Sequence, residues 1–164
     1  MVIVRPANAG DHAMIRAVTE AAFAESRGDE AGIIEGVRSE GLVLAELVAE
    51  DDGQVVGHVL FSRMRTEPPR AVAGLGPVAV APARQRTGIG DALCRAGIEA
   101  CRAAGMEAVV VLGHPPYYPR FGFSAEAAAK LTSPYAGNAA FMALELKPGA
   151  LREALKVDYP RAFG

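Results

Sequence analysis

The chain has 164 residues, of which 51% are hydrophobic, and its 17 basic and 19 acidic residues leave a net charge of −2 at pH 7. This length suits one domain over residues 1–164, in which a core at 2–147 carries a tail at 148–164 packed on it. So hydrophobic a chain is not globally disordered, and its charge balance gives no basic field of the kind that binds nucleic acid or an anionic membrane.

Three further features predict a cytoplasmic protein with no membrane partner. No apolar run approaches the roughly 20 residues that cross a bilayer, and the N-terminus lacks the apolar core of a signal peptide. Cys94 and Cys101 lie seven residues apart in a predicted helix. Two turns of helix separate them by roughly 10 Å, too far for a disulfide, so we expect two small core residues in a reducing compartment.

Hydrophobic periodicity and turn residues predict an ordered series of elements. In chain order these are a strand at 2–5, helices at 8–25 and 29–41, strands at 42–50 and 54–64, a loop at 67–70, a strand at 71–82, a helix at 88–105, a strand at 106–113, a turn at 114–123 and a last strand at 138–146. A hairpin-rich front half and a strand-helix-strand back half predict a mixed α/β (α+β) sheet with helices on its faces.

The stretch VAVAPARQRTGIGDAL, residues 78–93, joins a strand to a helix through two glycines, Gly88 and Gly90. The first N–H groups of a helix have no partner inside it, and glycines remove the side chains that would keep a ligand away from them. Backbone donors at the positive end of a helix form an anion site, to which Arg84, Gln85 and Arg86 can add side-chain donors. A pyrophosphate fits such a site.

Other interpretations of this stretch stay open on the residues alone. A dinucleotide fingerprint needs a third glycine at position 93, which is Leu93, and no Gly-Lys-Ser/Thr follows. The missing third glycine, the missing Gly-Lys-Ser/Thr and the antiparallel front half all disfavour a Rossmann-type nucleotide module. A tight strand-to-helix turn without a ligand is the structural alternative.

The segment QRTGIG, residues 85–90, matches the Gln/Arg-x-x-Gly-x-Gly/Ala signature of the GNAT superfamily of N-acetyltransferases. About thirty residues later, YYPRFGF resembles the second signature of that family, a tyrosine four residues before Gly-Phe. The order of elements is similar along residues 2–147, and the run from VVVLGHPPYYPRFGF onward most resembles the YhbS-like branch. The resemblance implies the GNAT fold: a mixed, mostly antiparallel sheet of six to seven strands, helices on both faces, and a splayed strand pair that admits coenzyme A.

By this resemblance, acetyl-CoA is the acyl donor and no metal ion is needed. The backbone N–H groups of the loop would hold its pyrophosphate, namely those of Arg86, Thr87, Gly88, Ile89, Gly90 and Asp91, with Gln85 at the Gln/Arg position of the family. The Thr87 hydroxyl could reach a phosphate. The strand at Val78, Ala79 and Val80 would bind the pantetheine arm by main-chain pairing, since Gly76-Pro77 offers a break, and a free N–H near Val78 could polarise the thioester carbonyl.

The implied reaction is direct attack of a primary amine, from an unidentified small-molecule acceptor, on acetyl-CoA. Tyr118 holds the family position for protonating the departing thiolate, whereas Tyr117 could contact substrate or simply pack. His114 is our candidate base, because it follows a strand end beside the turn and histidine is the side chain type most often used as a base or proton relay. Glu50 and His58 are weaker candidates, interpreted as a solvated strand end and a satisfied sheet histidine, and a water relay would need no base at all.

The acceptor itself is not identified by any motif. Residues 24–41 would shape its pocket, and the acids there either receive an amine or form a solvated helix face: Glu25, Asp29, Glu30 and Glu35. The family also implies a homodimer through exposed strand edges. The alternative from another functional class is a non-catalytic acyl-CoA-binding sensor, which the presence of Tyr118 beside an intact glycine loop disfavours.

Overall fold

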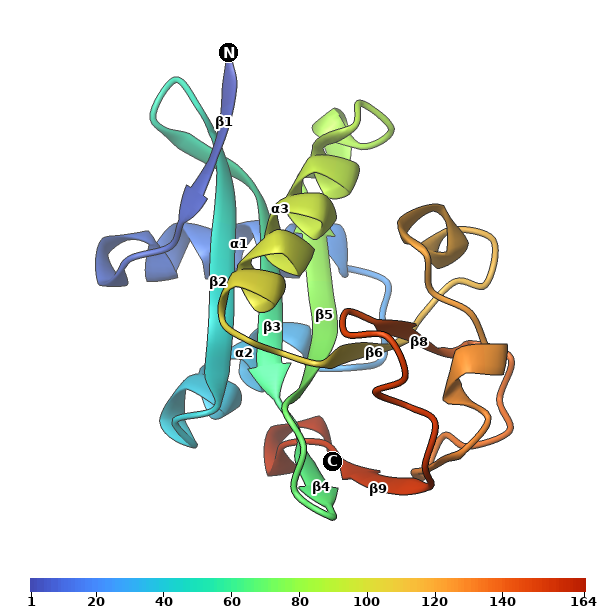
Figure 1. The fold of residues 1–164 in the computed structure, drawn as a ribbon. Coiled ribbons are helices and arrows are strands. Elements are labelled where there is room, and N and C mark those ends of the chain that lie inside the picture. Colours follow the sequence, from blue (N-terminus) through green and yellow to red (C-terminus); the bar gives the residue numbers. More distant parts are fainter.

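The computed structural model describes all residues from 1 to 164 and contains a main sheet of six strands (Figure 1). In spatial order these are β1 (Val2–Pro6), β2 (Val43–Asp51), β3 (Gln54–Arg63), β5 (Val72–Val80), β6 (Ala108–Leu112) and β8 (Phe141–Glu145). Every neighbouring pair is antiparallel except β5 and β6, which run parallel. The mixed, mostly antiparallel sheet expected from the sequence is confirmed.

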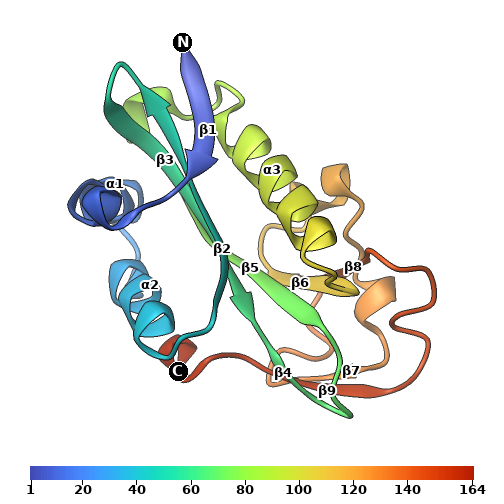
Figure 2. The same cartoon turned by 60° about the vertical axis from the view of Figure 1, so that its left-hand side comes forward.

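Helices cover both faces of this sheet. Figure 2 shows α1 (His12–Ala22) and α2 (Glu30–Ser39) on one side and α3 (Ile89–Ala103) on the other. Ile15 and Val37 anchor the first side against β2 and β3, and Leu93 anchors α3 on the opposite face. In each helix, apolar residues recur at helical spacing on the side that meets the sheet. Burial of this apolar surface therefore fixes which face of each helix packs against the sheet.

The helices begin where capping residues satisfy their first N–H groups. Asn8 forms a capping box at the 3-10 turn Ala9–Asp11 that leads into α1, as expected. Asp29 caps α2 by accepting a hydrogen bond from the Gly32 N–H at 3.0 Å. The helix α3 differs, because no side chain caps its N-terminus.

The parallel pair β5–β6 opens halfway along β5. Its register runs from Val72 opposite Ala108 to Leu75 opposite Val111, and no pairing with β6 follows beyond Leu75. On its other edge, β5 stays paired with β3 through a bulge that accommodates Gly76 and Pro77. The residues between Gly76 and Val80 therefore leave one strand edge open, at the break that the sequence predicted.

A second sheet of three short strands lies beside the first, and the sequence did not predict it. It consists of β4 (Arg65–Glu67), β9 (Leu155–Asp158) and β7 (Leu131–Thr132), in that spatial order. The strand predicted at 138–146 is present as β8, but the sequence placed no strand in the tail, where the four-residue β9 follows it. Leu155 and Val157 are buried while the alternate residues face outward, so the strand forms through pairing and one-sided burial.

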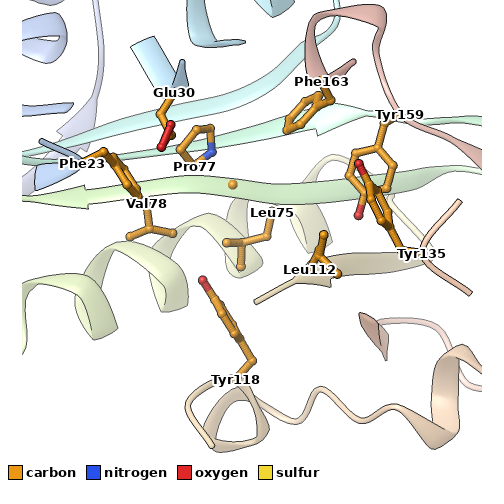
Figure 3. A pocket seen from close by; sticks show the side chains of 11 residues that line it. Phe23, Glu30, Leu75, Pro77, Val78, Leu112, Tyr118, Tyr135, Tyr159 and Phe163 are labelled. Atoms are coloured by element: carbon orange, nitrogen blue, oxygen red, sulfur yellow. The ribbon is translucent and has the colours of Figure 1, made fainter. Parts of the chain in front are cut away.

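The tail after β9 lies against α2. Glu40, which follows α2, accepts hydrogen bonds from the backbone N–H groups of Arg161 and Ala162, both at 3.0 Å. The 3-10 helix Arg161–Phe163 contacts α2. Figure 3 shows the Phe163 side chain among the walls of a pocket beside β5. The last residues thereby reach the neighbourhood of β5 from the opposite end of the chain.

Candidate active site

A row of unpartnered backbone donors marks the start of α3. Gly88 occupies the N-cap position with φ +90°, a left-handed conformation that favours glycine, and no side chain caps the helix. The N–H groups of the six residues from Arg86 to Asp91 donate to no protein acceptor, and the helical hydrogen bonds begin with Ala92 N–H to the Gly88 carbonyl at 3.0 Å. These donors lie at the positive end of a four-turn helix, where an anion is stabilised.

This stretch, the glycine loop (residues 84–91), borders a pocket of about 280 Å³ that we call the loop pocket. Most of the residues predicted to bind the cofactor line it: Val78, Val80, Gln85, Arg86, Gly88, Ile89, Gly90 and Asp91. Ala79 does not line it, because its side chain is buried in the sheet. A Cβ added to Gly88 would meet no atom within 4 Å, so the space beside this glycine is open.

The side chains of the glycine loop divide into those that hold the loop and those that are free. Thr87 donates its hydroxyl to the Arg84 carbonyl at 2.5 Å, so in this structure it braces the loop and does not present a free donor. Arg84 pairs with Asp51 at 2.8 Å. Arg86 is exposed and forms no ion pair, which leaves one unpaired positive charge beside the free N–H groups.

The open edge of β5 presents backbone groups to the same pocket. Ala81 N–H donates to the Val56 carbonyl on β3, and bonded residues alternate along an antiparallel ladder. The backbone groups of Val78 and Val80 therefore point away from β3, toward the edge that β6 has left. The Val80 carbonyl already accepts a hydrogen bond from Gln85 Nε2 at 3.1 Å, in agreement with this orientation.

Two adjacent tyrosines close the loop pocket on its other side. Tyr117 donates its hydroxyl to Asp91 Oδ1 at 2.6 Å, and Arg120 stacks over its ring at 4.2 Å. This hydroxyl therefore ties the turn after β6 to the first turn of α3. Tyr118 belongs to the 3-10 helix Tyr118–Phe121, and its hydroxyl forms no hydrogen bond within the protein.

The position of the Tyr118 ring depends on a close approach to Gly113. A Cβ at Gly113 would lie 2.2 Å from Tyr118 Cε2, so the ring rests directly on a backbone without a side chain. The edges of Tyr117 and Phe123 complete its packing, with ring centroids 5.0 and 6.0 Å away. Burial raises the pKa of the Tyr118 phenol, with the nearby Cys94 thiol adding to the effect, so the phenol keeps its proton at neutral pH.

Beyond Tyr118 lies a second cavity, of about 310 Å³, which we call the aromatic cavity (Figure 3). Its walls come from distant parts of the chain: Phe23, Glu30, Leu75, Gly76, Pro77, Val78, Leu112, Tyr118, Tyr135, Tyr159 and Phe163. In Figure 3 the Tyr118 hydroxyl points toward Leu75 and Val78. Val78 and Tyr118 line both the aromatic cavity and the loop pocket, so the two spaces meet at these residues.

The candidate bases lie outside both spaces. His114 is exposed, and although its carbonyl accepts the Tyr117 N–H at 3.0 Å, its side chain lines neither pocket. Glu50 pairs with Arg5 at 2.9 Å and lines neither pocket. His58 is fully buried in the sheet, with Nε2 bonded to Glu46 at 2.8 Å. Its Nδ1 is buried without a partner, so the satisfied sheet histidine that we expected is satisfied at one ring nitrogen only.

The four acids of the predicted acceptor region separate in the same way. Glu25 is exposed, Asp29 caps α2, and Glu35 pairs with the exposed Arg16. Glu30 alone lines the aromatic cavity. Sequence reasoning treated these acids alike, because nothing in their spacing distinguishes the one that turns inward.

The aromatic walls other than Tyr118 were also missed in the sequence. Phe23 follows α1, Tyr135 lies in a turn before β8, and Tyr159 and Phe163 lie in the tail. For Tyr135, Tyr159 and Phe163 the available signal was a large aromatic side chain in a segment with no predicted element to bury it, whereas Phe23 fell inside the helix predicted at 8–25.

The structure contains neither a metal-binding cluster of side chains nor a helix that could span a membrane. No group of three or more His, Cys, Asp or Glu side chains is arranged to hold a metal ion. None of the helices is both long enough and apolar enough to cross a bilayer. Cys94 and Cys101 are free, buried thiols, as predicted.

Known proteins resemble this chain in sequence and in structure. The profile of the acetyltransferase (GNAT) family matches residues 12–123. The uncharacterized N-acetyltransferase YhbS of Escherichia coli K12 is 34% identical over 125 residues, which cover 74% of this chain and 75% of YhbS. The uncharacterized N-acetyltransferase YjhQ of the same organism is 45% identical over 80 residues, which cover 47% of this chain but only 44% of YjhQ.

Two crystal structures align along nearly the whole chain. A GNAT family acetyltransferase from Brucella melitensis in complex with acetyl-CoA is 37% identical, with a TM-score of 0.84 over 100% of this chain and 99% of that one. The structure of E. coli YhbS in complex with CoA is 31% identical, with a TM-score of 0.89 over 99% of this chain and 91% of that one. The agreement of profile, sequence and fold shows that the chain belongs to the GNAT family of N-acetyltransferases.

Proposed function

We propose that residues 1–164 act as one N-acetyltransferase domain that transfers an acetyl group from acetyl-CoA to a primary amine of a small molecule. The observation that carries this proposal is the junction of two spaces at Val78 and Tyr118. One space has free backbone donors for a pyrophosphate, and the other is an aromatic-lined cavity for an acceptor. The similar Brucella and E. coli proteins were crystallised with acetyl-CoA and CoA, which supports the same donor here.

The donor would lie along the glycine loop and the open edge of β5. The free N–H groups from Arg86 to Asp91 would bind its pyrophosphate, with Gln85 and Arg86 beside it, and the pantetheine amides would pair with Val78 and Val80. Ala79 contributes by holding this part of β5 to β3. Thr87 would contribute by bracing the loop, unless a bound phosphate draws its hydroxyl from the Arg84 carbonyl.

The transfer itself joins two reactants across the junction. The amine nitrogen attacks the thioester carbonyl carbon, a C–N bond forms, the C–S bond breaks, and the sulfur leaves as a thiolate. The Val78 N–H, facing the open edge, would hydrogen-bond the carbonyl oxygen as negative charge develops there. The Tyr118 phenol would donate its proton to the departing sulfur, and the proton that the nitrogen loses as the amide forms would return through water to the Tyr118 phenolate.

Direct transfer is favoured over an acetyl-cysteine intermediate. Burial raises the pKa of both cysteine thiols to about 12, so almost no nucleophilic thiolate exists at neutral pH. Both side chains are fully buried between α3 and the sheet and line neither pocket. Two free thiols suit a reducing compartment, and we place the reaction in the cytoplasm.

Calorimetric titration with acetyl-CoA tests the donor site. Gly88→Glu would place a carboxylate beside the free N–H groups, and we expect it to abolish micromolar binding by charge repulsion. Gly88→Ala is the matched control, since it imposes the same backbone strain at φ +90° without the charge, and it should retain most of the affinity. A folded wild-type protein that does not bind acetyl-CoA, or equal binding by the two variants, would contradict the proposed donor site.

A further inference from the structure

The aromatic cavity holds an unusual share of the large side chains of this chain. Five of its lining residues are aromatic, whereas the whole chain has only six Phe, four Tyr and no Trp. Tyr159 packs edge-on against both Tyr135 and Phe163, with ring centroids 5.4 and 5.3 Å away, so these rings form a connected wall. Such a wall suits an apolar skeleton and can face a cation with ring π electrons.

One carboxylate, that of Glu30, lines the cavity beside these aromatic rings. Glu30 is the single ionisable acid among the lining residues, and no Lys, Arg or His lines the cavity. One of its carboxylate oxygens, Oε2, is buried and has no hydrogen-bond partner. A position in the first turn of α2 stabilises a carboxylate through the helix dipole, but it does not satisfy that oxygen.

A second polar atom in the cavity is also unpartnered. The Tyr159 hydroxyl is buried without a hydrogen bond, and burial raises the pKa of this phenol, so it stays neutral. Buried polar groups are almost always hydrogen-bonded, and those that are not commonly face a ligand or water. Glu30 and Tyr159 are two such groups among the walls of one cavity.

From these observations we infer that the acceptor is a small monoamine cation with an aromatic or aliphatic skeleton, and that Glu30 binds its ammonium group. This inference rests on the proposed acetyl transfer and names its substrate class. The carboxylate would pair with the R–NH₃⁺ form, the aromatic wall would contact the skeleton, and Tyr159 would accept or donate one further hydrogen bond. Before the attack, the ammonium would pass one proton to solvent water, so that the neutral amine is the nucleophile.

The composition of the cavity also excludes other amines. An α-amino acid would bring a carboxylate that no cationic side chain in the cavity can meet, and it would lie near the charge of Glu30. A polyamine or an aminoglycoside would bury several cations against apolar rings with one anion between them. Neither class fits a cavity whose other lining side chains are uncharged.

The size and place of the cavity agree with this class. Its volume of about 310 Å³ is roughly twice that of a buried cavity of about 150 Å³ known to bind benzene in another protein. A phenyl ring with a two-carbon aminoalkyl chain therefore fits. Glu30, Val78 and Tyr118 line the same space, so an amine bound by Glu30 is delivered to the proposed thioester position.

A matched set of probes tests the inference on the full chain. The set is 2-phenylethylamine, phenylalanine, which adds a carboxylate to the same skeleton, spermidine, which is a polycation, and 2-phenylethanol, which lacks the charge. Binding to the CoA-loaded protein is measured by ligand-observed NMR, and transfer is measured by thiol release from acetyl-CoA. We expect 2-phenylethylamine to bind and to be acetylated with a kcat/KM at least about tenfold above the other two amines, and 2-phenylethanol to bind more weakly.

The variant Glu30→Gln isolates the charge. Loss of a charge-assisted contact should lower kcat/KM for 2-phenylethylamine by about 10- to 100-fold, chiefly through KM, while the Kd for acetyl-CoA stays unchanged. Glu35→Gln is the control, because it removes an acid of the same helix that pairs with the exposed Arg16, and it should change neither quantity.

The two proposals fail in different ways. Absence of acetyl-CoA binding to the folded wild type would overturn the acetyltransferase proposal itself. Intact acetyl-CoA binding without 2-phenylethylamine binding, a preference for phenylalanine or spermidine, or an unchanged Glu30→Gln variant would overturn only the assignment of the acceptor.

Discussion

Replacing Gly113 by alanine should slow acetyl transfer without touching any reacting group. The new Cβ would lie 2.2 Å from Tyr118 Cε2, whereas ordinary contacts begin near 3.4 Å, so the ring or the backbone must retreat by about 1.2 Å. Gly113 has no positive φ, so alanine is allowed by the backbone and the clash is the main perturbation. A misplacement of about 1 Å can cost roughly 10²-fold in rate, or about 2.7 kcal/mol of activation free energy.

Steady-state kinetics and donor binding separate this effect from general damage. We expect kcat with 2-phenylethylamine to fall about 10²-fold while calorimetry gives an unchanged Kd for acetyl-CoA, because Gly113 does not line the loop pocket. Overpacking should also lower the free energy of unfolding by about 1–3 kcal/mol, which urea denaturation would detect. If another amine proves to be the acceptor, the same comparison is made with that amine.

A double-mutant cycle with Tyr118→Phe decides whether the tyrosine transmits the effect. If the ring acts through its hydroxyl, Gly113→Ala should cost little more once that hydroxyl is gone. Full additivity of the two changes, or a Gly113→Ala enzyme with kcat within about twofold of wild type, would refute the role that we give to the placement of Tyr118.

Three further predictions concern single side chains. Tyr118→Phe should lower kcat by about 10²-fold with acetyl-CoA affinity unchanged, as expected for loss of a proton donor, and an unchanged kcat would remove Tyr118 from the reaction. Tyr117→Phe should instead act on stability, lowering the free energy of unfolding by about 1–2 kcal/mol through loss of its bond to Asp91, with kcat changed only a few-fold; a large loss of kcat would show a part in the chemistry. For Glu46, burial alone would raise the pKa of the carboxyl. Hydrogen bonds from His58 and Arg38 outweigh the effect of burial and hold this pKa at about 2, against 4.5 for an ordinary glutamate. The unfolded chain therefore takes up this proton first, stability is lost as pH falls from about 4.5 toward 2, and Glu46→Gln should flatten urea-denaturation midpoints across that range; an unchanged slope would contradict the shift.

The parts of the molecule that the sequence predicted well are coded by neighbouring residues. The glycine loop and α3 follow from a contiguous stretch in which two glycines precede an apolar stripe of helical period. The break in β5 was expected from Gly76 and Pro77, because neither residue continues a regular ladder. These features depend on the conformations allowed to neighbouring residues, so they can be predicted from the sequence.

Other features depend on partners distant in the chain. The strand β9 has only four residues, two of them apolar, and it exists because β4 and β7 pair with its two edges. Likewise, nothing near Glu30 in the sequence distinguishes it from Glu35, and only the approach of β5 and the tail makes a cavity beside it. Thr87 is a related case, since its hydroxyl donates to the Arg84 carbonyl in this structure, a contact that the sequence does not display.

The two halves of the proposed site are encoded very differently. The free N–H donors come from one short stretch between Arg86 and Asp91, whereas the aromatic cavity is assembled from at least five separated segments, of which Phe23 and Phe163 are the most distant. Substitutions at Phe23, Tyr135 or Phe163 can therefore reshape the choice of acceptor while donor affinity stays constant. Natural variation, or a combinatorial library at these three positions, would change which amine is accepted while the acetyl-CoA site stays the same.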